Sequence, residues 1–199
     1  MRLILHQFLT LDGVYQAPGG LDEDRAGGFE HGGWQTPYRA PAGGATVAGW
    51  FGQAGAFLLG RKTYEVFSNS WPAVTDPANP IASKLNSLPK YVASATLSSV
   101  HWDNSSLLGG DVAAEVAKLK ELPGGELQVH GSGGLAQTLI EHDLIDEYRL
   151  VYFPVHLGSG KKLFRDGARA AALRLVSTQI TQAGVIFAYY EPAGDVRHG

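Results

Sequence analysis

The chain has 199 residues, of which 44% are hydrophobic and 18% charged, and its formal net charge is −3. These values fit one globular domain over residues 1–199, and the slight negative charge argues against general nucleic-acid binding. Cysteine is absent, which excludes disulfides and thiolate sites and is compatible with a reducing cytoplasm, where we expect the protein to act. No stretch approaches the ~20 apolar residues of a membrane span, so we expect no membrane partner.

The predicted elements of the first third begin with a strand. Residues 2–13 read as a buried strand that ends in an Asp-Gly turn. Residues 13–44 are rich in glycine and proline and predict a long loop, which in a compact domain is usually functional or mobile. A helix weakened by its glycines is expected at 45–56, then a short buried strand at 56–60 and a helix at 61–70.

The remaining elements continue this alternation. We expect a short helix at 81–88, a strand at 90–97 and another short strand at 100–104. The clearest helix lies within 110–125, where Asp111 can cap the first turn by accepting an exposed backbone N–H. The elements after it are a strand at 126–130, a helix within 131–144, a central strand within 146–158, and strands at 172–180 and 185–192 that form a hairpin.

The order of these elements predicts the fold class. Strands that alternate with helices favour a three-layer α/β/α fold with a mixed, mostly parallel sheet, and the last two strands add a C-terminal antiparallel hairpin. No repeat or change in composition divides the chain. We expect a short flexible tail at about 193–199.

Two predicted junctions between a strand and a helix carry anion-site chemistry. One is Gly60-Arg61-Lys62-Thr63, and the other is the segment QVHGSGGLA at 128–136. A helix N-terminus presents unpaired N–H groups, glycines let a phosphate approach the backbone, and arginine can hold it through two hydrogen bonds. Solvated cations and simple turns would explain either junction alone equally well. Two such junctions together favour a ligand with several phosphates.

Other motifs match known sites poorly. GSGGLA fits the G-x-G-x-x-A form of the dinucleotide fingerprint, but no acid follows at the end of the next predicted strand. The segment at 156–164 lacks the first glycine and the final Ser or Thr of a P-loop. The seven histidines have no metal-ligand spacing, so we expect no metal site. Asp12 is either a turn residue or a polar group that faces the site.

Several segments, in order, resemble the dihydrofolate-reductase-like superfamily: LTLDGV, LLGRKTYE, SATL, VHGSGGLAQTLIEHDLIDEYRL and FPVHLGSGKKLF. Within it, the chain most resembles the branch that shares the C-terminal reductase domain of bacterial riboflavin biosynthesis. The resemblance covers nearly the whole chain. It implies a reductase fold that binds NADPH across the carboxyl-terminal edge of the sheet.

The resemblance also implies which residues meet the cofactor. Arg61 and Lys62 would select the 2′-phosphate of NADPH, and Ser94 and Thr96 would lie near its adenosine. Asp12 is the candidate proton donor, with water as the alternative. The residues implied in cofactor binding are Leu11, Gly13, Gly60, Arg61, Lys62, Thr63, Ser94, Thr96, Gly131, Ser132, Gly133, Gly134 and Leu135.

One departure from the family pattern bears on the substrate. The carboxylate that holds a pterin in dihydrofolate reductases would fall near Gly44, yet residues 42–54 contain no Asp or Glu. We therefore expect an NADPH-dependent oxidoreductase of a small heterocyclic or carbonyl substrate, similar to the pyrimidine reductase of the riboflavin pathway. A nucleotide-binding module without turnover is the alternative. The apolar C-terminal hairpin favours a homodimer.

Overall fold

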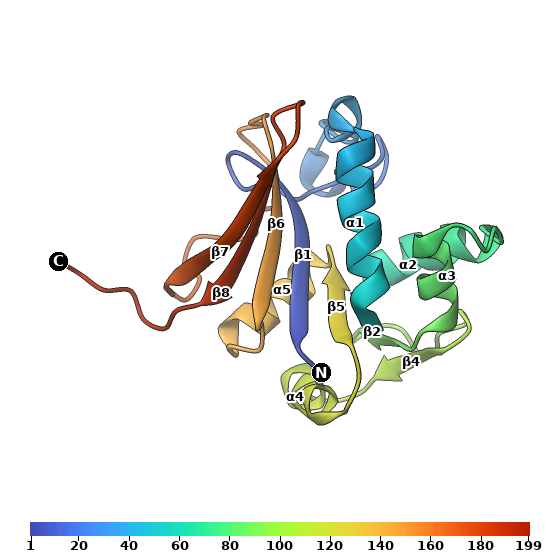
Figure 1. Cartoon of the computed structure of the whole chain (residues 1–199). Helices are drawn as coiled ribbons and strands as arrows, with labels where there is room; N and C mark the ends of the chain where they lie inside the picture. The colour runs from blue at the N-terminus through green and yellow to red at the C-terminus, as the bar shows by residue number, and fades with distance from the viewer.

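A computed structural model describes all residues, 1–199, and its centre is one eight-stranded sheet, whose arrangement is drawn in Figure 1. The strand order is β4-β3-β2-β5-β1-β6-β8-β7. Neighbours from β4 to β6 pair in parallel, whereas β8 pairs antiparallel with both β6 and β7. The strands are β1 Leu3–Thr10, β2 Ala54–Gly60, β3 Lys90–Ala93, β4 Ser105–Leu108, β5 Glu126–His130, β6 Glu147–Phe153, β7 Leu173–Ile180 and β8 Ile186–Pro192.

Helices cover both faces of this sheet, which confirms the predicted three-layer α/β/α fold with its C-terminal antiparallel hairpin. They are α1 Pro41–Gln53, α2 Arg61–Ser70, α3 Pro80–Ser87, α4 Val112–Glu121 and α5 Gly133–Glu141. Short 3₁₀ helices lie at Ala26–Gly28, Thr36–Tyr38 and Trp71–Ala73. No helix has the length and apolar character needed to cross a membrane.

The alternation of side chains along β1 separates two cores. Leu5 and Leu9 point to the face covered by α4 and α5, where they join Leu139 in one hydrophobic cluster. The opposite face is covered by α1, whose Trp50 and Phe51 are buried in two further clusters. Each fully buried side chain of this size contributes roughly 1.5–3 kcal/mol, so both layers stabilise the sheet.

Two segments differ from the sequence prediction. Helix α1 begins at Pro41, inside the predicted loop, since proline suits the first turn of a helix and the aromatic side chains of α1 bury its far end. Strand β4 lies at 105–108 rather than 100–104. The earlier segment is held as a loop because His101 and Trp102 donate their backbone N–H groups to the hydroxyl of Tyr64.

Other local expectations are confirmed. The carboxylate of Asp111 accepts the N–H groups of Ala113 and Ala114, at 2.9 and 3.2 Å, and caps α4. Where β2 begins beside the residue that precedes β5, Gly55 and Gly125 let two backbones touch: a β-carbon on Gly55 would lie 2.7 Å from the nitrogen of Gly125. Both positions therefore need glycine.

A buried polar layer lies between α1 and the sheet. The rings of His6 and His130 stack with centroids 4.3 Å apart, and Phe51 stacks on the other side of His130. Burial, then the nearby Arg149, lowers the pKa of His130 to about 3, and burial lowers the pKa of His6 well below its ordinary value. Both rings are neutral at pH 7. No three His, Cys, Asp or Glu side chains in the chain come together as a metal site.

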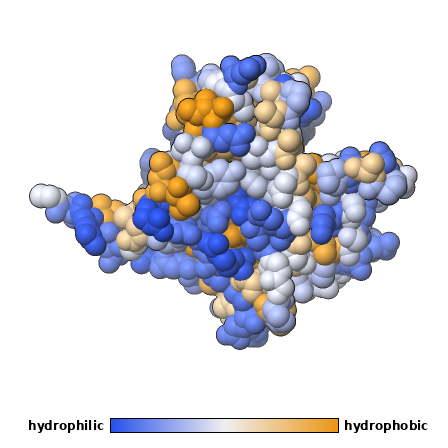
Figure 2. Space-filling view, in the orientation of Figure 1, coloured by the Kyte–Doolittle hydropathy of each residue, from blue (hydrophilic) through white to orange (hydrophobic).

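The outer edge of the sheet is formed by β7. Its apolar side chains Leu175, Val176 and Ile180 are 51%, 51% and 67% exposed. Figure 2 shows hydrophobic patches along this strand, on the left of the view. The edge strand is therefore apolar and uncovered within one chain.

Candidate functional site

The candidate site lies where the parallel strands end. The register pairs Gly60 of β2 with Ala93 of β3, and His6 of β1 with His130 of β5. Helix α2 begins immediately after β2, and α5 follows the end of β5 after two intervening residues, so both N-termini lie at this edge. Ligands of open α/β sheets bind at such carboxyl-terminal edges.

One hydroxyl group joins the two strand–helix junctions. The oxygen Oγ of Ser132 accepts the backbone N–H of Gly60 at 2.9 Å and donates to Oγ1 of Thr63 at 2.8 Å. Ser132 itself has a left-handed backbone with φ of 58°, directly after Gly131 with φ of 63°. This tight turn and the two hydrogen bonds of Ser132 hold the start of α5 against the start of α2. Four of the predicted residues are thus brought together.

The residues expected near an adenosine also lie close together. Arg61 donates from Nη1 to Oγ1 of Thr96 at 3.3 Å. Ser94 accepts the N–H groups of Thr96 and Leu97, which fixes the loop after β3. The guanidinium of Arg61 remains about half exposed, with its Nε 3.9 Å from Glu65. It is therefore free to turn toward a ligand at this edge.

Lys62 has a different partner. Its Nζ lies 3.0 Å from Oδ1 of Asp24, and Lys161 donates to Oδ2 of the same carboxylate. Burial raises the pKa of Asp24, but the hydrogen bonds from Lys161 and Lys62 outweigh it and leave the pKa below its usual value. Asp24 is thus a charged group held between two lysines from separate segments of the chain.

The glycine cluster is partly covered. A β-carbon on Gly133 would lie 1.9 Å from the Tyr15 ring, so this ring rests directly on the start of α5. A β-carbon on Gly134 would meet no atom within 4 Å, so this position stays open. Burial, then the negative charge of Asp24, raises the pKa of Tyr15, so its phenol keeps its proton at neutral pH.

Asp12 ties two loops together. Its carboxylate accepts hydrogen bonds from the Thr10 hydroxyl at 2.5 Å and from the N–H groups of Leu157 and Gly158. Although burial acts in the opposite direction, these bonds lower the pKa of Asp12 to about 2. Gly13, with φ of 80°, closes the turn. Of the two roles open for Asp12, this geometry favours the turn, since an ionised carboxylate is a poor acid at neutral pH.

The other two predicted residues differ in exposure. Leu11 is 62% exposed at the end of β1 and can contact a ligand. Leu135 is buried in the core between β2 and α5, so its side chain is not available at the edge. Its predicted role in cofactor binding would have to use the backbone.

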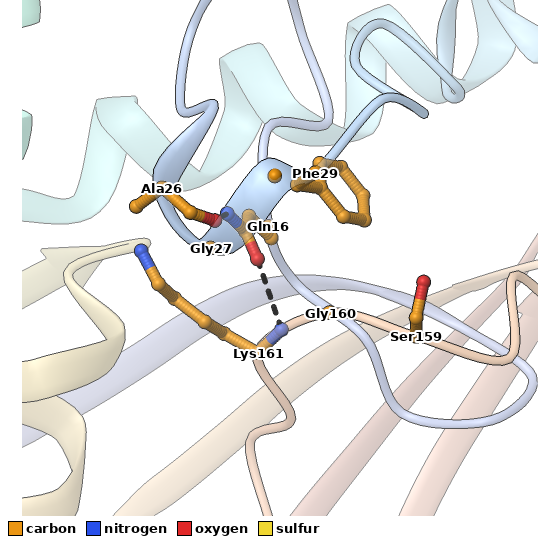
Figure 3. A pocket seen from close by; sticks show the side chains of 8 residues that line it. Gln16, Ala26, Gly27, Phe29, Ser159, Gly160 and Lys161 are labelled. Carbon is orange, nitrogen blue, oxygen red and sulfur yellow. Dashed lines mark hydrogen bonds between the residues drawn. The ribbon is translucent and has the colours of Figure 1, made fainter.

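A cavity of about 320 Å³ opens beside the cluster of Asp24 and its lysines (Figure 3). Gln16 forms one wall: its Oε1 accepts the backbone N–H of Lys161 at 3.1 Å, and its Nε2 donates to the carbonyls of Asp24 and Ala26. The full lining is Gln16, Ala26, Gly27, Gly28, Phe29, Ser159, Gly160 and Lys161. The cavity therefore lies between the loop after β1 and the loop after β6.

Sequence reasoning missed the contacts of Tyr15, Gln16 and Lys161, and it had Asp24 only as one of four loop acids, with Asp22, Glu23 and Glu30, that could supply substrate contacts. Tyr15, Gln16 and Asp24 lie in the glycine-rich loop, where no periodic pattern or motif marks a single residue. Lys161 belongs to the segment at 156–164, whose only motif signal is an incomplete P-loop. The one available signal was the unusual length of the loop after β1, which pointed to a functional segment without naming its contacts.

Solved structures show the class to which this fold belongs. A putative riboflavin biosynthesis protein from Shewanella sp. PV-4 matches with a TM-score of 0.68 and 22% identity, over 96% of this chain and 99% of that chain. Dihydrofolate reductase from Enterococcus faecalis, complexed with NADP(H), matches with a TM-score of 0.61 and 13% identity, over 96% of both chains. The protein thus has a dihydrofolate-reductase-like fold.

Sequence comparison gives the family. Residues 2–187 match the model of the RibD C-terminal domain, and the chain belongs to that family. The uncharacterized protein YyaP of Bacillus subtilis strain 168 is 30% identical over 198 residues, which cover 95% of this chain and 94% of YyaP. The uncharacterized protein YwjB of the same strain is 30% identical over 122 residues, 61% of this chain and 65% of YwjB.

Proposed function

We propose that this protein is an NADPH-dependent reductase of a small heterocyclic or carbonyl substrate, similar to the pyrimidine reductase of the riboflavin pathway. The observation that carries the proposal is the Ser132 hydroxyl, which bonds to Gly60 and Thr63 and so directs two helix N-termini to one place. Two converging N-termini favour a ligand with more than one phosphate. As part of the same proposal, the protein acts in the cytoplasm as a homodimer.

The residues at this edge fit such a cofactor. Gly134 leaves open space at the start of α5, as a close approach of a pyrophosphate requires. Arg61 is half exposed beside Thr96, where a guanidinium can pair with a 2′-phosphate. When bound, NADPH supplies a hydride. The chain supplies position and charge: α2 and α5 hold the phosphates, and the exposed Leu11 and the cavity beside Gln16 offer contacts for the reacting groups.

The substrate proposal rests on α1. The sequence position expected for a pterin carboxylate falls in its first turn, and α1 contains no acidic residue. The acids on the sheet beneath α1, Glu126 and Glu147, both pair with Arg149. A pterin ring buried there would leave polar groups unpaired, at roughly 1–3 kcal/mol each. Dihydrofolate is therefore a poor substrate in this proposal.

Two measurements test the proposal. NADPH and NADH are titrated by nicotinamide fluorescence, and we expect NADPH to bind more tightly. NADPH oxidation is then followed by absorbance with the aminopyrimidine substrate of the riboflavin pathway, simple carbonyl compounds, and dihydrofolate in excess. Turnover of an aminopyrimidine or carbonyl compound with negligible turnover of dihydrofolate would support the reductase, and rapid dihydrofolate reduction would contradict it.

A nucleotide-binding module without turnover is the second candidate. The low pKa of Asp12 favours it, because that carboxylate is ionised and no other acid lies at the end of β1. In a reductase the proton would then come from water. NADPH binding without oxidation by any tested compound would favour the binding module.

A further inference from the structure

The loop between β1 and α1, residues 11–40, covers both halves of the proposed cofactor site with its own side chains. Tyr15 rests on Gly133 at the start of α5, so closely that a β-carbon there would overlap the ring. Asp24 brings a carboxylate to Lys62 in the first turn of α2. The Tyr15 ring therefore fills the space beside the backbone of Gly133 that a ligand would use, and the Asp24 carboxylate supplies a negative charge to Lys62.

The anion is held by two lysines. Lys62 contacts one carboxylate oxygen of Asp24 and Lys161 contacts the other, while the Asp24 carboxylate is only 15% exposed. Lys62 comes from α2 and Lys161 from the loop after β6, so the carboxylate joins two elements that lie about a hundred residues apart in the chain. Two cations on different oxygens of one group are the arrangement that a phosphate also satisfies.

Other charged groups nearby have their own partners. Arg61 lies beside Glu65 and donates to Thr96. Arg25 pairs with Asp22, and Arg165 pairs with Glu141. The lysine pair, Lys62 and Lys161, therefore depends on Asp24 alone for its counter-charge in this conformation.

We propose that Lys62 and Lys161 together form a phosphate-binding pair, and that Asp24 occupies this pair as an internal competitor which the cofactor phosphate displaces. The inference rests on the proposed function, because it describes how that same site opens. When a phosphate takes the lysine pair, Asp24 is released, and with it the segment that carries Tyr15 off Gly133. The loop therefore closes the site when it is empty and leaves it when the cofactor arrives.

The energetics fit an exchange of this kind. Partly exposed ion pairs are individually weak, so a ligand with several phosphates can replace this one. A site that is closed in most molecules binds with an apparent affinity reduced by the fraction that is open. Removal of the competing charge should raise that fraction, and the gain should be larger for NADPH than for NADH, which lacks the extra phosphate.

The first test is Asp24→Asn, with Asp22→Asn as the matched control, since Asp22 is an exposed acid two residues away that pairs with Arg25 only. Fluorescence titration should show NADPH binding about tenfold tighter in Asp24→Asn, a smaller change for NADH, and no change in the control. Unchanged or weaker NADPH binding in Asp24→Asn would overturn the inference.

The second test needs no cofactor turnover. Limited trypsin digestion should cut after Arg25, within the loop, faster in Asp24→Asn than in the wild type. Inorganic pyrophosphate should speed this cut in the wild type but not in Asp24→Asn, when compared with sodium chloride at equal ionic strength. If pyrophosphate does not change the rate of trypsin cleavage after Arg25 in the wild type, the inference is overturned even if NADPH binds. If pyrophosphate speeds the cleavage but NADPH does not bind, the lysine pair is a phosphate site and the proposed cofactor is wrong.

The role of Lys161 is tested in a variant that lacks the competing carboxylate of Asp24. In the Asp24→Asn background, Lys161→Met should weaken NADPH binding about tenfold, because one of the two cations is lost, whereas Lys118→Met on the outer surface of α4 should have no effect. Equal NADPH affinity with and without Lys161 would show that Lys62 acts alone and would overturn the pair.

Discussion

The two strand–helix junctions at the site edge differ in the chemistry that each would offer to the proposed cofactor. The junction of β2 and α2 uses charged side chains, Arg61 and Lys62, on flexible stems. The junction of β5 and α5 uses backbone, with glycines and the left-handed Ser132. Side-chain cations need a counter-charge when no ligand is present, and the chain provides Asp24. A bare backbone surface needs cover, and the chain provides Tyr15.

This difference means that the two junctions should respond to different changes. Charge changes should affect ligand selection at α2 with little effect on the fold. Added volume or altered hydrogen bonds at α5 should affect the fold itself, because Tyr15 and Ser132 are already packed there. The following predictions test that division, from the largest expected effect to the smallest.

Acid should lower the free energy of unfolding through two buried histidines at the β5 junction, one on β5 and one on the neighbouring β1. His130, the last residue of β5, and His6 beside it are buried and neutral, whereas both take up protons near pH 6.5 in the unfolded chain. The free energy of unfolding is highest above pH 6.5, and it falls below that pH because the unfolded chain takes up protons that the buried rings do not. For His130 this loss continues down to its folded pKa of about 3. Between pH 7 and about pH 5 we expect a loss of about 2 kcal/mol per histidine. Urea unfolding at both pH values measures it.

A substitution of His130 tests whether the buried imidazole causes this loss of stability in acid. His130→Phe keeps the stack with Phe51 and removes one titrating group, so the pH-dependent part should fall by about half. The exposed His198→Phe is the control and should keep the full dependence. A slope unchanged in His130→Phe would mean that other groups cause the acid response.

Removal of the arginine at the α2 junction should change ligand choice. Arg61→Ala should weaken NADPH binding by about 1.5–3 kcal/mol, in the range of a charged hydrogen bond, and NADH binding by less. Arg174→Ala, on β7, is the matched control because its guanidinium pairs only with Glu191. Fluorescence titration gives both affinities. An equal loss for the two cofactors would place Arg61 away from the 2′-phosphate.

Added volume at the α5 junction should act on the fold. The ring of Tyr15 already occupies the space beside Gly133. Gly133→Ala should therefore lower the free energy of unfolding by about 1–3 kcal/mol, as overpacking does. Gly134→Ala should leave it unchanged or raise it by up to about 1 kcal/mol, since alanine favours the helix. Chemical denaturation of both variants decides; equal stabilities would mean that Tyr15 moves away freely.

The smallest effect should come from the hydroxyl that joins the junctions. Ser132→Ala removes both of its hydrogen bonds and should lower the free energy of unfolding by about 1 kcal/mol. NADPH affinity should fall as well, because α2 and α5 lose their common orientation. Ser132→Gly suits the left-handed backbone but also lacks the hydroxyl, so its NADPH affinity should fall as in Ser132→Ala. A normal affinity in Ser132→Ala would show that the helices hold their position without it.

Local signals explain what the sequence could predict. The strands, the helices and the cap at Asp111 follow from periodicity, glycine and capping residues, which act within a few positions. The junctions were found because their residues are adjacent in the chain. The hydrogen bonds that link the two junctions through Ser132 could not be predicted, since Gly60 and Thr63 lie far from Ser132 in the sequence.

Long-range contacts explain what the sequence could not. Tyr15 and Asp24 sit in a loop without regular spacing, and only the folded chain brings them to Gly133 and Lys62. A long-range contact also explains the strand wrongly expected at 100–104: its apolar residues are typical of a strand, but the hydroxyl of Tyr64 accepts backbone N–H groups there and holds the segment as a loop. The stacked pair of His6 and His130 needed the register of β1 against β5.

The central place of β1 has a consequence for synthesis of the chain. Leu3 pairs with Leu127 and Ile4 with Glu147, so β1 leaves the ribosome more than a hundred residues ahead of the strands that pair with it. At roughly 5–20 residues per second, that interval is on the order of ten seconds. During this time the apolar segment LILHQFL has no partner strand, and the nascent chain must keep it from pairing with other chains.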